Sequence, residues 1–257
     1  MRELATLGFV FALVAISQPA AAETAQSILQ QTDKVRNPGA PFTVLDTLVE
    51  YKSGKPTAKT VLRVYAKLDQ EIGQYKNLVR YVEPADDAGK SLLMSGNIMW
   101  FYDPNSAATI RISPQQRLLG QASNGDVLSV NLSGDYIAAL SGEEAVESAE
   151  HKSLDCWRLD LSAAKPSAVY GRIEYWVEKG TYHPVKARFY ADSGRLLKVA
   201  FYAGYQSALG GERPTEVFIV DELDKSLVTT MSFTGYASVD IPDAWYQRSF
   251  LPHLPNE

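Results

Sequence analysis

The chain has 257 residues, of which 46% are hydrophobic and 11% aromatic, and it carries 25 basic and 30 acidic side chains. This length is ample for one domain with a full hydrophobic core, and the aromatic content excludes an intrinsically disordered chain. The net charge of −5 argues against nucleic-acid binding, which needs a basic surplus. One cysteine and three widely separated histidines offer neither an intrachain disulfide nor a metal-ligand spacing, so we expect no metal site.

The N-terminus has the pattern of an export signal. Residues 4–16 form an apolar run behind Arg2, and Ala20-Ala21-Ala22 precedes Glu23. This order is typical of a secretory signal peptide, and the run is too short to span a hydrocarbon core of about 30 Å comfortably. An uncleaved membrane anchor is the alternative. We expect cleavage after Ala22, leaving residues 23–257 as one domain in a Gram-negative periplasm.

The elements that follow are one helix and then a series of strands. Apolar residues at helical spacing predict a helix over 24–36, which Asn37-Pro38-Gly39 ends. Beyond it the hydrophobic period changes from 3.6 to about two residues, as expected of half-buried strands. The predicted strands cover 60–68, 74–82, 97–102, 108–112, 154–161, 172–178, 184–190, 196–202, 216–222 and 226–233.

Short turns between the later strands predict an antiparallel meander. About a dozen strands exceed what a flat open sheet usually holds, so we expect a curled or closed sheet. Several strands carry bulky apolar groups on both faces: in 97–102, Trp100 and Tyr102 point one way while Met99 and Phe101 point the other. This favours a curled sheet with a helix on one face and a cavity on the other, and two-sided burial in a β-sandwich is the alternative.

The search for catalytic motifs finds none. The chain has no G-x-S-x-G, H-E-x-x-H, Walker or G-x-G-x-x-G sequence. We therefore predict no catalytic residues and no enzyme activity. An enzyme would need a polar cluster at the cavity mouth, for which the sequence offers Arg111, Arg117 and Asp126 together with His183.

The least ordinary segment runs from Arg111 to Tyr136. Ser113 and Pro114 fit the N-cap and first position of a short helix that ends at Gly120, and a second short helix follows Ser133 with Tyr136, Ile137 and Leu140 on its apolar side. Such helices would form a lid over a cavity mouth or a plug in the core. The residues taken as lid or motif candidates are Arg111, Pro114, Arg117, Gly120, Asn124, Gly125 and Asp126.

An exported chain with an N-terminal amphipathic helix and strand after strand resembles the outer-membrane lipoprotein-sorting proteins. The hairpin 175–190 is similar to that family's strand, turn and x-P-v-k strand, and 192–201 continues it in the expected order. The stretches 99–104 and 110–127 resemble the LolA-like subgroup. The resemblance covers nearly all of residues 23–257, most firmly 75–235.

This resemblance implies a mainly β fold, a half-open antiparallel β-barrel in which helices cover an apolar cavity. It implies a monomeric carrier, without cofactor, that shelters the acyl chains of a lipoprotein or lipid, receives them from an inner-membrane transporter and delivers them to an outer-membrane acceptor. The alternative is a non-catalytic scaffold protein of an inner-membrane exporter. Arg63 and Arg111 both fit the family's lid arginine. The candidates for the cavity are Trp100, Tyr102, Leu118, Leu119, Trp176, Phe189 and Phe201.

Overall fold

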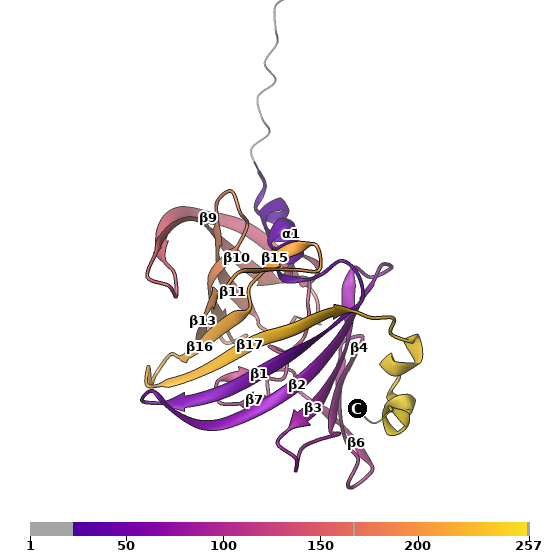
Figure 1. Ribbon diagram of the computed structural model, residues 1–257. Helices are drawn as coiled ribbons and strands as arrows, with labels where there is room; N and C mark the ends of the chain where they lie inside the picture. Colours follow the sequence, from indigo (N-terminus) through magenta and orange to yellow (C-terminus); the bar gives the residue numbers. More distant parts are fainter. Residues whose placement is uncertain (1–22, 167, 256–257) are drawn as a thin grey trace, which may run out of the picture.

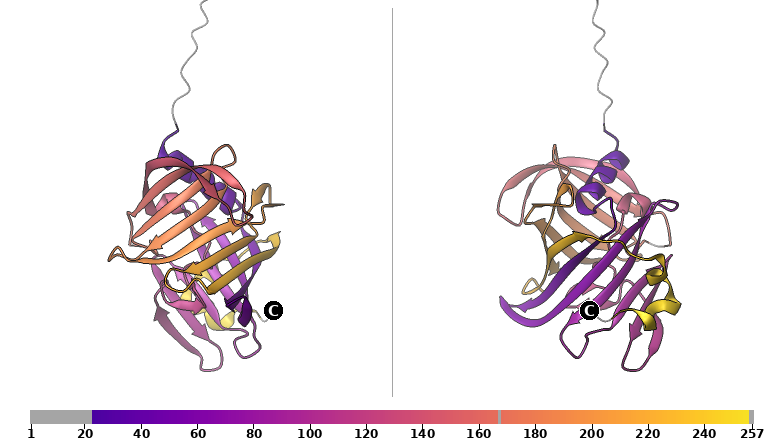
Figure 2. Two further views of the ribbon diagram at one scale, coloured as in Figure 1. Left: turned by 90° about the vertical axis from the view of Figure 1, so that its left-hand side faces the viewer. Right: turned by 45° about the vertical axis from the view of Figure 1, so that its right-hand side comes forward.

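A computed structural model describes residues 23–166 and 168–255, so the predicted signal peptide lies outside the described residues. Helix α1 (Ala25–Arg36) is followed by one large antiparallel sheet that curls around the interior (Figures 1 and 2). Across the sheet, the strands are β6 (Ala108–Ile112), β5 (Ile98–Asp103), β4 (Ser91–Ser95), β3 (Gln74–Glu83), β2 (Lys55–Asp69), β1 (Phe42–Lys52), β17 (Leu227–Ser238), β16 (Glu216–Asp221), β13 (Leu196–Ala203), β12 (Pro184–Tyr190), β11 (Arg172–Glu178), β10 (Ser153–Ala163) and β9 (Tyr136–Glu147).

The sheet does not close, because β6 and β9 remain its two edges. The predicted fold, a half-open barrel of one curled antiparallel sheet, is therefore confirmed. No helix among the described residues is long and apolar enough to cross a membrane. The remaining elements are small: β7 (Arg117–Leu119) with β8 (Ala122–Ser123), β14 (Gln206–Ala208) with β15 (Gly211–Arg213), helix α2 (Leu132–Asp135), and the 3-10 helices η1 (Asp243–Tyr246) and η2 (Arg248–His253).

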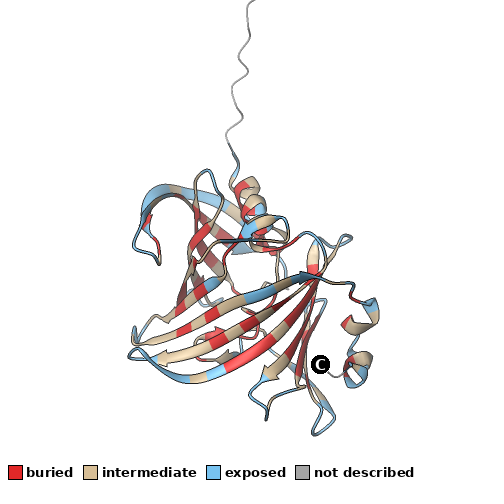
Figure 3. Cartoon of the chain, in the orientation of Figure 1, coloured by how far each residue is buried: buried red, intermediate tan, exposed pale blue. Residues whose placement is uncertain are grey.

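The two faces of the sheet bury different cores. The inner face carries the main core, onto which α1 packs Ile28 and Leu29. Figure 3 shows buried residues, in red, along α1 and along the strands. On the outer face, η1 and η2 cover a second core around Tyr65 and Leu93. Figure 1 shows these two C-terminal helices, in yellow, beside β4. A third, smaller core lies on the outer side of β9–β12. Helix α1 and the main core thus share the inner side, and short 3-10 helices cover part of the outer face.

The predicted N-terminal helix and every predicted strand are present. The side chain of Thr24 caps α1 by accepting a hydrogen bond from the backbone N–H of Ser27 at 3.1 Å. Strands β1, β4 and β9 of the large sheet were missed, as was the short pair β14–β15. In β1 the inner face reads Phe42, Val44, Asp46 and Leu48, and the buried aspartate interrupts the apolar alternation that identifies a strand.

Neither of the two short helices predicted within 111–136 forms as expected. Residues 117–123 make the β7–β8 hairpin instead of a helix, because Gly120 takes a φ of 53° and turns the chain back on itself. The second helix, α2, ends at Asp135, and Tyr136 begins β9. The apolar residues assigned to that helix, Ile137 and Leu140, instead lie in the ladder of β9 with β10 and are exposed.

A candidate ligand cavity inside the curled sheet

A cavity of about 130 Å³ lies inside the curled sheet, between α1 and residues 113–135. We call residues 113–135 the inner segment, because they run along the inner face of the sheet from edge strand β6 to edge strand β9. Apolar side chains make up most of the cavity wall, as expected for a site that binds hydrocarbon. They include Phe42, Val44, Val64, Val127, Leu128, Val130, Ile173, Phe189, Val217, Ile219, Met231 and Phe233.

A buried ion pair fastens the inner segment to the sheet. The ammonium of Lys198, on β13, contacts the carboxylate of Asp126, and the side chains of these residues are only 6% and 10% exposed. Asp126 also accepts hydrogen bonds from the hydroxyl of Tyr170 at 2.7 Å and from the backbone N–H of Ser123 at 2.7 Å. Burial, together with Asp126, holds the pKa of Tyr170 well above its usual value, so this phenol remains a donor.

Further along, side-chain amides of β3 hold the inner segment by its backbone. Asn77 donates to the carbonyl of Ser129 at 2.9 Å and accepts from its N–H at 2.8 Å. Gln74 makes the equivalent pair of bonds to Asn131, at 3.1 and 2.7 Å. These bonds satisfy backbone groups that have no strand partner, and they let an irregular segment cross a buried surface.

Helix α1 closes the same side of the cavity. Asp33 accepts hydrogen bonds from the N–H groups of Leu132 and Ser133 at 2.9 and 2.8 Å, and so caps α2 from a neighbouring helix. Burial raises the pKa of Asp33, against the opposing effects of Arg36 and these N–H groups. The guanidinium of Arg213 donates to the carbonyls of Lys34 and Val35, both at 3.1 Å, and caps the C-terminal end of α1.

One buried carboxyl in the interior has no hydrogen-bond partner among the described residues. Asp46, on β1, is 0% exposed, and neither of its side-chain oxygens accepts a hydrogen bond. Burial raises its pKa well above the usual value, and Asp126 raises it further. Its neighbours on the same face are Leu62 and Phe233, so a charged form would be poorly solvated.

The structure divides the predicted cavity residues between the two faces. Phe189 lines the cavity, and Leu118 and Leu119 pack against the main core. The other four lie on the outer face: Tyr102 and Trp100 in the core under η1 and η2, and Trp176 and Phe201 in a separate groove. The alternation of faces along a strand was recognised, but sequence alone does not say which face is the inner one.

The lid and motif candidates are similarly divided. Gly125 and Asp126 line the cavity, and Asn124 is buried beside them, with its N–H bonded to the carbonyl of Gln116 at 2.9 Å. Gly120 forms the β7–β8 turn, and the carbonyl of Pro114 accepts from the N–H of Gly125 at 2.8 Å. Arg111 and Arg117 are exposed.

Neither arginine considered for the lid faces the cavity. Arg63 alternates on β2 with Leu62 and Val64, which belong to the main core, so it lies on the outer face. Arg111 is exposed on β6, opposite Trp100. The arginine that does line the cavity is Arg36, at the end of α1.

The polar cluster considered for an enzyme is not assembled. His183 stacks on the ring of Tyr205 at 3.8 Å, in a hollow that contains none of the other three residues. Asp126 is paired with Lys198 in the interior, while Arg111 lines a third hollow beside Pro114. The residues named for the enzyme hypothesis therefore do not form one site.

Sequence reasoning missed Lys198, Asp46, Asn77 and Arg213, all of which are buried. Lys198 gave the clearest signal, a lone charge among apolar neighbours within 196–203. Asn77 and Arg213 lie beside other polar residues and gave no such signal. A single charge in such a run indicates a buried partner, but the partner, Asp126, lies in an irregular segment whose position no periodicity predicts.

Comparison with known proteins agrees with this architecture. A family model described as "Uncharacterized protein" matches residues 73–253. The LolA superfamily protein NE2245 from Nitrosomonas europaea is 31% identical, with a TM-score of 0.79 over 89% of this chain and 100% of that one. A DUF1329 family protein from Desulfovibrio piger is 22% identical, with a TM-score of 0.74 over 88% and 97% of the two chains.

A domain assigned to outer-membrane lipoprotein sorting from Vibrio parahaemolyticus has the same fold at 17% identity, with a TM-score of 0.73 over 89% of this chain and 98% of that one. A search of curated proteins finds no match to the sequence. Since NE2245 exceeds 30% identity over its whole length and the sheet, helix and cavity have the expected arrangement, the chain belongs to the LolA superfamily.

Proposed function

We propose that this protein is a periplasmic carrier that shelters the acyl chains of a lipid or lipoprotein in the interior cavity during transfer between membranes. The observation that carries this proposal is the cavity itself, which is lined mostly by apolar side chains from the sheet and the inner segment. Burying about ten methylenes at ~0.8 kcal/mol each gives ~8 kcal/mol before ordering costs, which corresponds to an affinity near micromolar. An affinity in this range is tight enough to hold the cargo and weak enough to release it.

The cavity must enlarge to take an acyl chain. Its volume is about 130 Å³, close to the ~150 Å³ of an engineered apolar cavity that takes up one benzene. The described conformation therefore suits the end of one chain. The inner segment and α1 form the part of the wall that is not a strand ladder, so we propose that they move when cargo enters.

The superfamily relationship supports the compartment and the partners. Relatives named for the LolA superfamily and for lipoprotein sorting favour export by the signal peptide at 1–22, and they favour exchange with an inner-membrane transporter and an outer-membrane acceptor. Transfer of this kind requires no cofactor and no catalytic group, since cargo enters and leaves unchanged. The rival role is a scaffold protein of an exporter, whose interior holds only side chains.

Native mass spectrometry of the protein purified from a periplasm, with titration of a fluorescent acyl probe, tests the carrier. We expect a co-purified lipid or acylated peptide and saturable probe binding. Val130→Phe, which places a ring in the cavity, is expected to weaken probe binding at least tenfold. Ile110→Phe, at an exposed position of β6, is the matched control. An apo mass with no probe binding would refute the carrier and leave the scaffold role.

A further inference from the structure

A second hollow, of about 680 Å³, lies on the outer face of the sheet. We call it the outer groove. It lies between the end of β9 with the following turn and the outer sides of β10–β13 and β16. Trp176 faces this groove, while its neighbours Tyr175 and Val177 on β11 belong to the main core. The outer groove and the interior cavity are thus on opposite faces of one sheet.

Three cationic side chains surround one indole ring in the outer groove. The Cζ atoms of Arg158 and Arg188 lie 5.6 and 5.4 Å from the ring centroid of Trp176, and the Nζ atom of Lys186 lies 5.2 Å from it. Lys186 is also 5.5 Å from the ring centroid of Phe201. Cations on aromatic faces are stabilised by the ring quadrupole, but the ring neutralises no charge.

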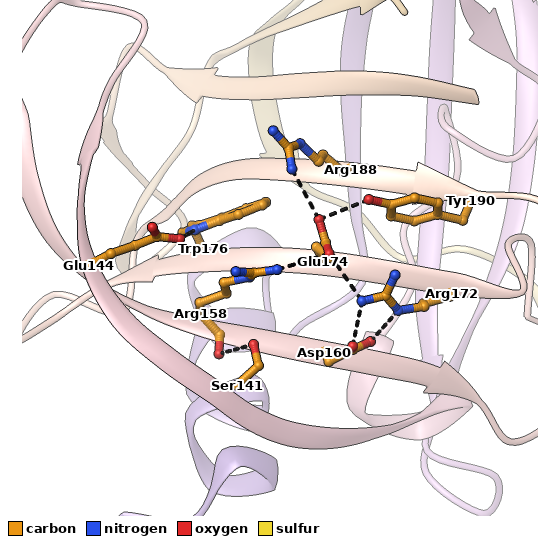
Figure 4. A network of polar contacts seen from close by, with 9 residues as sticks. All are labelled: Ser141, Glu144, Arg158, Asp160, Arg172, Glu174, Trp176, Arg188 and Tyr190. Atoms are coloured by element: carbon orange, nitrogen blue, oxygen red, sulfur yellow. Dashed lines mark hydrogen bonds and ion pairs between the residues drawn. The ribbon is translucent and has the colours of Figure 1, made fainter. Parts of the chain in front are cut away.

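Two carboxylates support the arginines, because Asp160 accepts from the Nε of Arg172 at 2.7 Å and Glu174 accepts from three guanidinium groups (Figure 4). Glu174, whose side chain is 7% exposed, accepts from Arg158 and Arg172 at 3.0 Å each and from Arg188 at 3.4 Å (Figure 4). It also accepts from the hydroxyl of Tyr190 at 2.9 Å. Four donors saturate the oxygens of Glu174, so this carboxylate holds the arginines together and has no lone pair left for Lys186.

The other acidic groups of the groove have their own partners. Glu144 accepts from the indole N–H of Trp176 at 2.6 Å, and Glu147 lies 2.6 Å from the ring of His151. The side-chain ammonium of Lys186 makes neither an ion pair nor a hydrogen bond within residues 23–166 and 168–255, although its backbone pairs within the sheet. Burial lowers the pKa of Lys186 and Arg188 lowers it further, against the opposing effects of Glu144, Glu174 and Glu222. The Nε atom of Arg158 is buried and has no acceptor within the same residues.

Donors without an acceptor, beside an apolar floor, indicate what kind of ligand the groove would bind. We propose that the outer groove binds an amphiphile with an oxyanionic head group, a phosphate or a carboxylate, which contacts Lys186, Arg158 and Arg188. The apolar part of the ligand lies on Trp176, Phe201 and Phe218. Guanidinium groups bind such oxyanions through charge-assisted hydrogen bonds, and the groove volume is that of a small-molecule site. This proposal does not rest on the carrier function.

The four tryptophan indole N–H signals provide a site-resolved test by NMR, since Trp176 lies in the groove and Trp100 lies under η2. Dodecyl phosphate, dodecanoate and dodecyl maltoside share one tail and differ in head group. We expect saturable shifts of the Trp176 signal with the phosphate or the carboxylate, the stronger of the two identifying the head group. Dodecyl maltoside is expected to shift this signal little at equal concentration.

Substitutions connect the response to the residues. Lys186→Met keeps the length of the side chain, removes the charge and breaks no ion pair, and we expect it to weaken binding at least tenfold. Lys59→Met, at an exposed pair with Glu83, is the control. Val130→Phe, which fills the interior cavity, is expected to leave the Trp176 response unchanged. Equal binding by Lys186→Met, equal shifts with maltoside, or no Trp176 shift would overturn the proposal.

Discussion

At the scale of single residues, the interior is unusual in its polar groups. The Asp126–Lys198 pair lies between the inner segment and β13, and Lys198 also lies over the rings of Tyr170 and Phe189, at 5.1 and 5.6 Å from their centroids. Removing one member of a buried pair leaves an uncompensated charge, which costs more than the pair itself contributes.

Lys198→Met should therefore lower the free energy of unfolding by about 3 kcal/mol, because Asp126 stays buried without its cation. The double variant Lys198→Met/Asp126→Asn should recover at least half of that loss. Denaturant titration measures both, with the exposed Lys59→Met as the control, for which a change within ~0.5 kcal/mol is expected. A similar small loss for Lys198→Met would contradict a structural role for the pair.

The buried carboxyl of Asp46 gives a prediction about how folding stability depends on pH. Its folded-state pKa is raised well above 3.8, so the folded chain keeps a proton that the unfolded chain releases as the pH rises. The contribution of this group to stability is therefore greatest at low pH, and it declines between pH 3.8 and the raised folded-state pKa. Asp46→Asn removes this dependence.

We expect Asp46→Asn to match the parent near pH 4 and to exceed it in stability at neutral pH by at least ~1 kcal/mol. The reason is that the folded parent must there retain a proton that the unfolded chain releases, whereas Asn has no proton to release. Urea titrations across this range measure the difference. Asp86→Asn, in the exposed turn after β3, is the control and leaves the profile unchanged. A parent that is equally or more stable at neutral pH would show that the Asp46 carboxylate has a partner.

At the scale of elements, prediction succeeded where periodicity governs structure. Strands such as β11 and β12 were located to the residue, because short turns and period-two alternation fix their ends. The inner segment has no such period. Residues 129–133 are held by Asn77, Gln74 and Asp33. The β7–β8 hairpin is held by Thr229, whose hydroxyl accepts from the N–H of Gln121. Local sequence cannot predict partners from such distant elements.

The close packing of Gly125, in the inner segment, against Val169 leads to a further prediction. A Cβ atom at Gly125 would lie 2.7 Å from Cγ1 of Val169, well inside contact distance. Gly125→Ala should cost about 1 to 3 kcal/mol of stability. Val169→Ala should relieve most of this cost in the double variant. At Gly134, the nearest atom to a Cβ would be 3.5 Å away, so Gly134→Ala is the matched control. Additive losses in the double variant would exclude this contact as the cause.

At the scale of the whole molecule, we expect the inner segment and α1 to be the elements that move when the interior cavity opens. Hydrogen exchange with a bound acyl probe should show altered protection in 113–135 and in α1, while the ladders of β1, β2 and β17 stay unchanged. The reason is that these ladders lie within the continuous sheet, whereas the inner segment is held by side chains. Loss of protection in the central ladders would mean that the sheet itself deforms.

The connection between the two edges has a mechanical consequence. Strands β6 and β9 are at opposite ends of the sheet, yet they are consecutive in the chain apart from the inner segment that joins them. Widening the seam between these edges would stretch that one tether and break no ladder between neighbouring strands. The continuous sheet therefore resists the separation of its two edges. The length of the 23-residue inner segment, from 113 to 135, sets how far these edges can move apart.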